Sequence, residues 1–345
     1  MTSLLTNTAA MVALQTLNNI NDSLNTTNNR VSTGLRIAQA QDSAAYWAIA
    51  TTTASDNGAL GAVQDALSIG VSTLDVVYNG LETTRDSLQK MKELLVSARQ
   101  PGVDRMNVQV EINGLITDMQ NKAGASVINE QNFLAVDTSA AGFNANKAIV
   151  ASFERSASGI ALSTINLDIT NLVLTDAHAT ASSKTGILDK ERSITVGNDG
   201  IAGTADDGWG PNGVDDGGGG DDVVIQYATV VGLATAGATD PIGDLTDSAA
   251  DLATLELYIG LVDTALQETI SAQNTVGVNL ARAESQKTFV DALMDANDRA
   301  VGALIDANME EESTKLRALQ TQQQLSVESL SIANASAQNV LALFR

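Results

Sequence analysis

The side chains of this sequence that could bind a ligand are the carboxylates of a glycine-rich stretch between residues 196 and 243. It holds 13 of the 27 glycines and three pairs of adjacent aspartates: Asp206, Asp207, Asp215, Asp216, Asp221 and Asp222. Carboxylate oxygens on a flexible backbone suit Ca²⁺. The run GGGGDDVVI at residues 217–225 fits one calcium-binding nonapeptide, but the preceding nine residues break the pattern. The six aspartates are candidate calcium ligands, and a solvated acidic loop is the alternative that a single repeat favours.

Catalytic chemistry has few candidate residues. His178 is the only histidine, and the chain has no cysteine. A zinc site with two histidines and a thiolate nucleophile are therefore excluded, and we expect His178 to be an exposed loop residue. The pair Asp206 and Asp207 could do acid–base work if an apolar pocket raised one pKa, but a glycine-rich stretch offers no such pocket. The sequence predicts a chain that is not an enzyme and that needs no cofactor.

The charge of the chain excludes further classes of partner. The formal net charge is −22, with 19 Lys and Arg residues, which disfavours nucleic acid and anionic lipid as partners. No unbroken run of about 18 apolar residues is present for a membrane span. The first residues, MTSLLTNTAAMVALQT, lack the basic start and apolar core of a cleaved signal peptide. We expect no membrane insertion, and if the protein leaves the cell, it must use a route that does not read such a signal.

The elements that must position these residues begin with long helices. All three prolines lie between residues 101 and 241, so both ends of the chain are free of the strongest helix breaker. A leucine recurs at every seventh position: Leu60, Leu67, Leu74, Leu81, Leu88 and Leu95. A weaker row of apolar or small residues follows three positions later, from Val63 to Ala98. This heptad predicts a helix packed on another helix, ended by Gln100-Pro101-Gly102, with a second helix over residues 105–122.

The two ends of the chain carry thinner versions of this pattern. The packing positions predicted there are Leu17, Leu24 and Val31 at the N-terminal end, and Leu316, Leu319, Leu330, Val340 and Phe344 at the C-terminal end. Each apolar stripe is too narrow to hold a helix folded alone. We therefore expect the two arms to pair, to cover their remaining apolar surface with neighbouring copies, and to be disordered before assembly.

The middle of the chain has a different composition. Residues 163–174 alternate apolar and polar side chains, and residues 223–231 are rich in β-branched residues, so both segments are predicted strands. Residues 193–281 hold 14 Asp and Glu and no Lys or Arg, which indicates a solvated acidic insert. The predicted fold class is mainly α: a long antiparallel helical coiled-coil bundle built from both termini, with a β-containing, Gly/Asp-rich central insert.

Two segments resemble a known family. Residues 13–52, ALQTLNNINDSLNTTNNRVSTGLRIAQAQDSAAYWAIATT, are similar to the N-terminal signature of bacterial flagellins, especially the alphaproteobacterial branch. Residues 313–345, STKLRALQTQQQLSVESLSIANASAQNVLALFR, resemble the C-terminal signature. The resemblance implies five segments: inner-tube arms at 1–44 and 301–345, outer-tube helices at 45–135 and 251–300, and a surface-exposed variable insert at 136–250.

The resemblance also implies a function and its partners. It implies a secreted structural subunit that leaves the cell by flagellar type III export and polymerises into the bacterial flagellar filament for swimming motility. The implied partners are other copies of the chain, an export chaperone at the C-terminal arm, and the filament cap and hook-junction proteins. Two alternatives stay open: a hook-filament junction or minor flagellin protein, and a calcium-dependent surface adhesin that acts through residues 140–250.

In some bacterial branches an innate immune receptor reads the outer-tube helix of flagellin. The matching residues here are Leu88, Gln89, Lys90 and Glu93. The recognised forms usually carry arginines where this chain has Lys90 and Lys92, and lysine lacks the planar fork of arginine. We therefore expect this chain to escape that receptor.

Overall fold

The computed structural model describes residues 7–156, 159–196, 224–234 and 241–343. Most of these residues are helical, and short strands occupy the middle of the chain. The chain forms two compact units, residues 1–61 with 291–345, and residues 62–290. Helices α2 (Ala44–Ala98) and α4 (Ala249–Ile305) supply residues to both units. The predicted mainly α fold class with a β-containing centre is confirmed, and the division into five segments stays a prediction.

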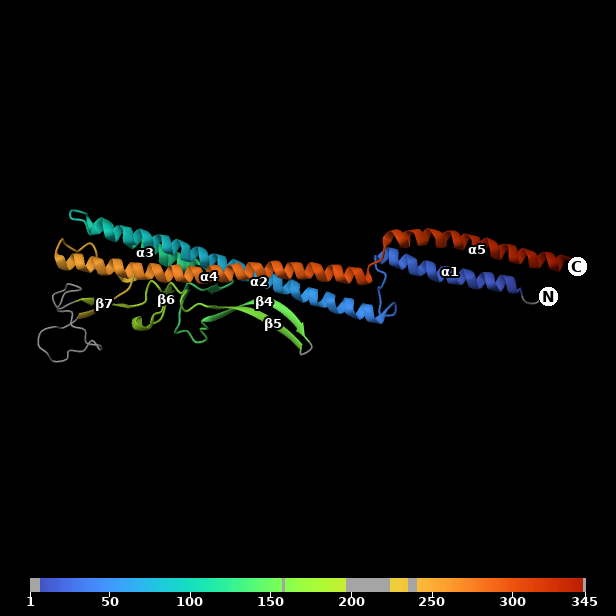
Figure 1. Ribbon diagram of the computed structural model, residues 1–345, viewed down its shortest axis with the longest axis horizontal. Coiled ribbons are helices and arrows are strands. Elements are labelled where there is room, and N and C mark those ends of the chain that lie inside the picture. Colours follow the sequence, from blue (N-terminus) through green and yellow to red (C-terminus); the bar gives the residue numbers. More distant parts are fainter. Residues whose placement is uncertain (1–6, 157–158, 197–223, 235–240, 344–345) are drawn as a thin grey trace. The chain divides into compact units, whose positions relative to one another are not determined.

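The unit of residues 62–290 is built on three long helices (Figure 1). The helix predicted at residues 105–122 is confirmed as α3 (Arg105–Ala125). Two ion pairs join α2 to α4: Lys92 with Asp263, and Arg99 with Glu256. Residue numbers rise along α2 where they fall along α4, so the two helices run antiparallel.

Heptad rows form the core along α2 and α4. Every leucine of the predicted ladder is 2% exposed or less: Leu60, Leu67, Leu74, Leu81, Leu88 and Leu95. The row three positions later is buried as well: Val63, Gly70, Val77, Thr84, Met91 and Ala98. A matching buried row runs along α4: Leu255, Val262, Thr269, Val276, Ala283 and Val290. Strict seven-residue rows on antiparallel helices are the geometry of a left-handed coiled coil.

One stretch of α2 is more apolar than the sequence analysis expected. An 18-residue window of this helix has a mean hydropathy of 1.3, so by length and composition it qualifies as a candidate membrane span. A core helix meets the same criterion. Because its leucine row is buried by other parts of the same chain, we interpret α2 as a core helix.

The turn between α2 and α3 lies where Pro101 and Gly102 predicted the helix end. Gly102 has a φ of 85°, a backbone conformation that favours glycine. The next helix begins with Arg105, which is buried and donates from Nε to the Ala98 carbonyl at 2.9 Å. Arg105 Nη2 also lies 2.6 Å from Asp247 Oδ1. This side chain therefore ties the end of α2 to the segment that leads into α4.

The strands form small two-stranded sheets within the same unit. Two pairs are short: β1 (Val127–Ile128) with β2 (Gln131–Asn132), antiparallel, and β3 (Ala135–Val136) with β6 (Thr175–Asp176), parallel. Two pairs are antiparallel and longer: β4 (Asn146–Ser156) with β5 (Gly159–Asp168), and β7 (Arg192–Val196) with β8 (Val224–Ala228). Two short 3₁₀ helices follow β6 and β8: η1 (Ala181–Ser183) and η2 (Val231–Leu233).

Both strand predictions were right in part. The strand predicted over residues 163–174 ends at Asp168, because Asp168 Oδ1 accepts hydrogen bonds from the Thr170 amide at 2.9 Å and the Thr170 hydroxyl at 2.6 Å. Such a side-chain bond two residues ahead turns the chain out of the strand. The strand predicted over residues 223–231 is confirmed at 224–228, where β8 lies.

Two glycines of α2 leave room for side chains of the central segment. A Cβ on Gly70 would lie 2.4 Å from Ile149 Cγ2, and a Cβ on Gly80 would lie 2.4 Å from Leu134 Cδ1. Both apolar side chains are buried. A glycine inside a helix costs about 0.5–1 kcal/mol relative to alanine, and the packing of Ile149 and Leu134 offsets this cost.

A buried carboxylate organises the loop that follows β6. Both oxygens of Asp176 accept hydrogen bonds from Thr138, one from its amide at 3.0 Å and one from its hydroxyl at 2.7 Å. The amide and hydroxyl of Thr185 donate at 3.1 Å each, and the His178 amide donates at 3.0 Å. The amide of Asp176 in turn donates to Asp189 Oδ2 at 2.7 Å. Burial raises the pKa of Asp189, whose side chain has little access to water.

We predict that Gly186→Ala destabilises this loop. An alanine Cβ at this position would lie 2.2 Å from Asp189 Oδ1 and 2.8 Å from the Leu174 carbonyl oxygen, so the backbone must shift. We expect a loss of about 1–3 kcal/mol in the free energy of unfolding, measured by urea denaturation. Gly114→Ala is the control, because a Cβ on this exposed glycine in α3 meets nothing within 4 Å. It should stabilise by about 0.5–1 kcal/mol, and equal signs for the two variants would contradict the prediction.

In the other unit, α1 (Thr8–Thr33) pairs with α5 (Met309–Leu343) (Figure 1). The sequence analysis expected long helices at both ends, and each end is interrupted once. Gly34 ends α1 with a φ of 73°, and its carbonyl accepts from the Ala307 amide at 2.8 Å. The Arg36 amide donates to the Ile305 carbonyl at 2.6 Å. The two interruptions are therefore hydrogen-bonded to each other.

Candidate assembly interface

The arms, by which we mean α1 and α5, face each other along two heptad rows. On α1 the less exposed positions include Ala10, Ala13, Leu17, Ile20, Leu24, Thr27 and Val31. On α5 they include Glu312, Leu316, Leu319, Gln323, Ser326, Leu330 and Ala333. Among the arm side chains that the structure describes, those of Thr27, Glu312 and Leu319 are the buried ones. The seam between the arms is therefore thin.

The packing residues predicted on the arms lie on this seam where the structure describes them. Five are half-buried and one is buried: Leu17, Leu24, Val31, Leu316 and Leu330, with Leu319. Val340 lies in the last part of α5, where side chains are not described, and Phe344 lies outside the described residues. Their part in self-assembly stays a prediction.

Polar contacts join the arms at three levels. Arg30 Nη1 lies 3.0 Å from Glu312 Oε1, near the end of α1 and the start of α5. Further along, Gln323 Nε2 donates to Asn21 Oδ1 at 2.7 Å. At the far level the side chain of Asn7, which caps α1, donates to the Ala333 carbonyl at 3.0 Å. The arms run antiparallel, and these contacts are the polar ones of the observed alignment of the two helices.

Large apolar side chains are exposed on the outer faces of both arms. Their exposed fractions lie between 50% and 66%: Met11, Val12 and Leu14 on α1, and Leu325, Val327 and Ile332 on α5. α1 carries few charges, because Asp22 and Arg30 are its ionisable residues, whereas α5 also exposes Glu310, Glu311, Lys315, Arg317 and Glu328. Exposed apolar surface of this extent on paired helices is typical of an interface that another protein surface covers.

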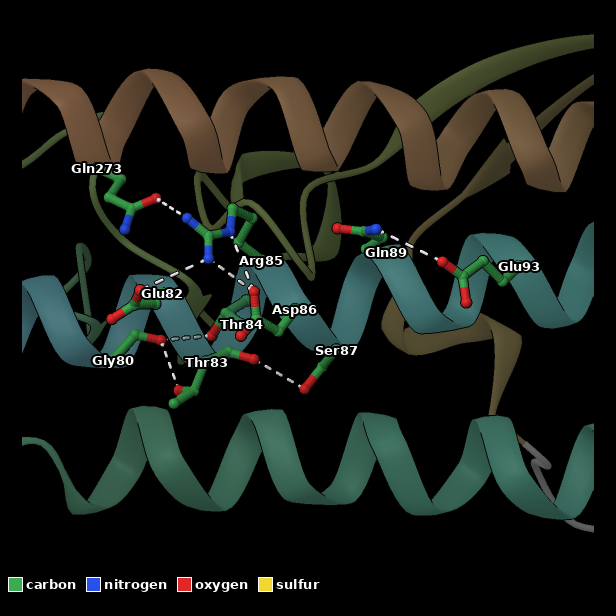
Figure 2. A network of polar contacts seen from close by, with 10 residues as sticks. All are labelled: Gly80, Glu82, Thr83, Thr84, Arg85, Asp86, Ser87, Gln89, Glu93 and Gln273. Atoms are coloured by element: carbon green, nitrogen blue, oxygen red, sulfur yellow. Dashed lines mark hydrogen bonds and ion pairs between the residues drawn. The ribbon is translucent and has the colours of Figure 1, made fainter.

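Figure 2 shows a polar network on α2, next to the segment predicted to face an immune receptor. Arg85 Nη1 donates to Gln273 Oε1 on α4 at 3.1 Å, and Arg85 Nη2 lies 2.8 Å from Asp86 Oδ1. The hydrogen bond to Asp86 raises the pKa of Arg85 above its ordinary value. Within α2 the hydroxyl of Thr84 donates to the Gly80 carbonyl at 2.8 Å, which satisfies a buried hydroxyl in the heptad row. The network is a structural link between helices.

Of the four residues that match the segment read by the receptor, one has no access to solvent. Leu88 has no exposed surface, because it belongs to the buried leucine row. The other three, Gln89, Lys90 and Glu93, are exposed. Lys90 Nζ lies 2.8 Å from Glu111 Oε1 on α3, and this hydrogen bond raises the pKa of Lys90.

The candidate calcium ligands, Asp206, Asp207, Asp215, Asp216, Asp221 and Asp222, all lie outside the described residues. In the part of the chain that is described, no group of three or more His, Asp and Glu side chains is placed to hold a metal ion. His178 lies in a loop as predicted, but it is half-buried rather than exposed. Its Nδ1 accepts a hydrogen bond from the Thr180 amide at 3.0 Å, so this side chain shapes a turn.

Comparison with known proteins matches these elements to one family. Residues 4–139 match the bacterial flagellin N-terminal helical region, and residues 259–344 match the bacterial flagellin C-terminal helical region. Flagellin C of Rhizobium meliloti strain 1021 is 41% identical over 346 residues, and the similarity covers all of both chains. Flagellin B of Rhizobium meliloti is 38% identical over 402 residues, and flagellin of Brucella melitensis is 34% identical over 352 residues, again with full coverage of both chains.

A chain with paired terminal arms and a central coiled-coil bundle, similar over its whole length to these relatives, is a structural protein and not an enzyme. The chain belongs to the flagellin family. It is a structural subunit that polymerises with other flagellin copies into the filament of the bacterial flagellum, an extracellular structure.

Sequence reasoning missed the buried row of α4. The row has the same spacing as the leucines of α2, and that spacing was the signal that could have found it: Leu255, Val262, Thr269, Val276, Ala283 and Val290. Alanine and threonine interrupt the apolar pattern, so the periodicity is weaker than that of the leucine row.

Proposed function

We propose that the arms make the contacts between copies in the filament, as an inner tube formed by residues 1–44 and 301–345. Residues 45–135 and 251–300 would form an outer tube, and residues 136–250 would face solvent. One observation carries this proposal: both arms expose large apolar side chains on their outer faces while the seam between them is thin. A helix pair with so little buried surface gains stability when neighbouring copies cover it.

The same surface supports a proposal for the partners that act before and during assembly. Leu325, Val327 and Ile332 on α5 would be exposed on any subunit that has not yet joined a filament. A cytoplasmic chaperone that covers this face would prevent premature association until flagellar type III export, and cap and hook-junction proteins would meet the arms at the filament ends. The relatives are named flagellins, which favours a filament subunit over a junction protein and gives no support to an adhesin.

Seeded growth tests the proposal. Purified full-length chain is mixed with filament fragments and inspected by electron microscopy, beside a variant that lacks residues 1–35. We expect the full chain to extend the seeds and the truncated variant to stay monomeric, because α5 has then lost its partner. Circular dichroism should show that the truncated variant keeps the helices of residues 62–290.

A matched control removes a segment outside the arms. Residues 197–223 are replaced by Asn-Gly, which suits a two-residue turn between β7 and β8, whose last pair is Val196 with Val224. This variant should still extend the seeds. The proposal would be contradicted if the truncated variant extended the seeds while the full-length chain did not.

A further inference from the structure

The ion pair of the arms joins a buried carboxylate, that of Glu312, to the half-buried guanidinium of Arg30. Glu312 is 8% exposed, and its Oε1 lies 3.0 Å from Arg30 Nη1. Its second oxygen, Oε2, is buried and has no hydrogen-bond partner in the described part of the chain. The cost of removing such a pair from water offsets most of its attraction, so apolar residues of similar size often stabilise equally well or better. The ion pair is therefore expected to contribute little to the stability of the paired arms.

The apolar rows alone do not define how the arms align. The inner positions of both α1 and α5 repeat every seven residues. If one arm slips along the other by seven residues, the inner positions of α1 again face inner positions of α5. Small and apolar residues such as Ala13, Ile20 and Leu330 would still contact residues of similar type on the other arm. Several alignments of similar packing quality are compatible with this pattern.

Polar contacts distinguish these alignments. In the observed alignment Arg30 is opposite Glu312, and Asn21 is opposite Gln323. A slip of one heptad places Arg30 at the level of Leu319 or Ile305. Glu312 would then be a buried charge without a partner, and the half-buried Arg30 would lose its carboxylate. A buried unpaired charge is more costly than a mismatch of apolar side chains.

We propose that the Arg30–Glu312 ion pair sets the register in which the two arms pair, with Asn21 and Gln323 as a second polar contact of the same register. The inference rests on the proposed function of the arms as the contact between copies. A subunit with a slipped register would present its outer apolar residues at the wrong level, so one register for all copies is a condition for a regular filament. Arg30 and Glu312 are in this sense positioning residues for assembly.

The test compares exchange of the two charges with their removal. Arg30→Glu combined with Glu312→Arg keeps an ion pair, whereas Arg30→Met combined with Glu312→Met replaces it by apolar residues. Because the chain has no cysteine, introduced cysteines report the register. Asn21→Cys is combined with Gln323→Cys to detect the observed register, or with Leu316→Cys or Leu330→Cys to detect slips of one heptad. Filaments grown on seeds are treated with a short bismaleimide, and products of monomer mass are quantified.

With the native pair, we expect adducts of residues 21 and 323 to exceed adducts of the slipped pairs at least tenfold. The exchanged pair should keep this ratio, and the apolar pair should lower it at least threefold. The inference is overturned if the apolar pair keeps the native ratio, or if the exchanged pair loses it. If the apolar variant forms no filaments, the test compares the exchanged pair with the single change Glu312→Arg. The exchanged pair should extend the seeds, and the single change should block growth. Failure of the unmodified chain to extend seeds would instead contradict the proposed function.

Discussion

Leu81→Ala should lower the free energy of unfolding of the central bundle by about 2–5 kcal/mol. Leu81 has no exposed surface and lies in the middle of the leucine row of α2. Truncation to alanine removes buried methyl groups and leaves a cavity, because the helices on either side are fixed by the other heptad contacts. Urea denaturation followed by circular dichroism measures the change as a lower midpoint. Seeded filaments of this variant should also dissociate at a lower temperature than those of the unchanged chain.

Ile69→Ala is the matched control for this prediction. It lies on the same helix and is also aliphatic, but its side chain is 54% exposed. Removal of an exposed aliphatic side chain should change the free energy of unfolding by about 0.5 kcal/mol or less. If the two variants lose similar amounts of stability, the leucine row is not the core of the bundle.

The sequence predicted the helical part of the fold because its signals are local. Six leucines at seven-residue spacing need no knowledge of distant residues to indicate a packed helix face. The helix end at Pro101 and Gly102 follows from the conformations that these two residue types favour. The same reasoning placed α3 within three residues of its observed end at Ala125.

Contacts between distant parts of the chain were beyond this reasoning. The arm contact between Arg30 and Glu312 joins residues 282 positions apart, and periodicity gives no alignment at that range. The spacing of Gly70 and Gly80 did not indicate that Ile149 and Leu134 would occupy the space above them. Sequence reasoning found the arms as the candidate interface but could not find the pair that fixes their register.

The loop around Asp176 shows the same limit more sharply. Its carboxylate gathers hydrogen bonds from Thr138, His178 and Thr185, which lie on both sides of it in the sequence. Sequence reasoning considered acidic side chains as metal ligands or acid–base groups and looked for them in the glycine-rich segment. The buried carboxylate of Asp176, which accepts five hydrogen bonds, lies instead at the end of a two-residue strand, where composition gives no signal.

Asp176→Asn should therefore destabilise the chain at neutral pH by about 2–4 kcal/mol, because one amide NH₂ would face groups that are themselves donors. Burial raises the pKa of Asp176, but the hydrogen bonds from Thr138, Thr185 and His178 lower it by more than burial raises it, so the pKa is about 2. The ionised form is thus favoured in the folded chain. Its contribution is complete above the ordinary pKa of 3.8 and is lost as the pH falls towards 2.

The difference in stability between the native chain and Asp176→Asn measures this contribution directly. It should be constant from pH 7 to about 5 and then shrink, with a slope approaching about 1.4 kcal/mol per pH unit between the two pKa values. Asp189 contributes with the opposite sign, because its pKa is raised by burial, but it is present in both proteins and largely cancels. Asp168→Asn is the control, since Asp168 is exposed and its carboxylate accepts hydrogen bonds from the amide and hydroxyl of Thr170. A difference for Asp176→Asn that stays constant down to pH 2 would show that the hydrogen bonds do not depend on the ionised carboxylate.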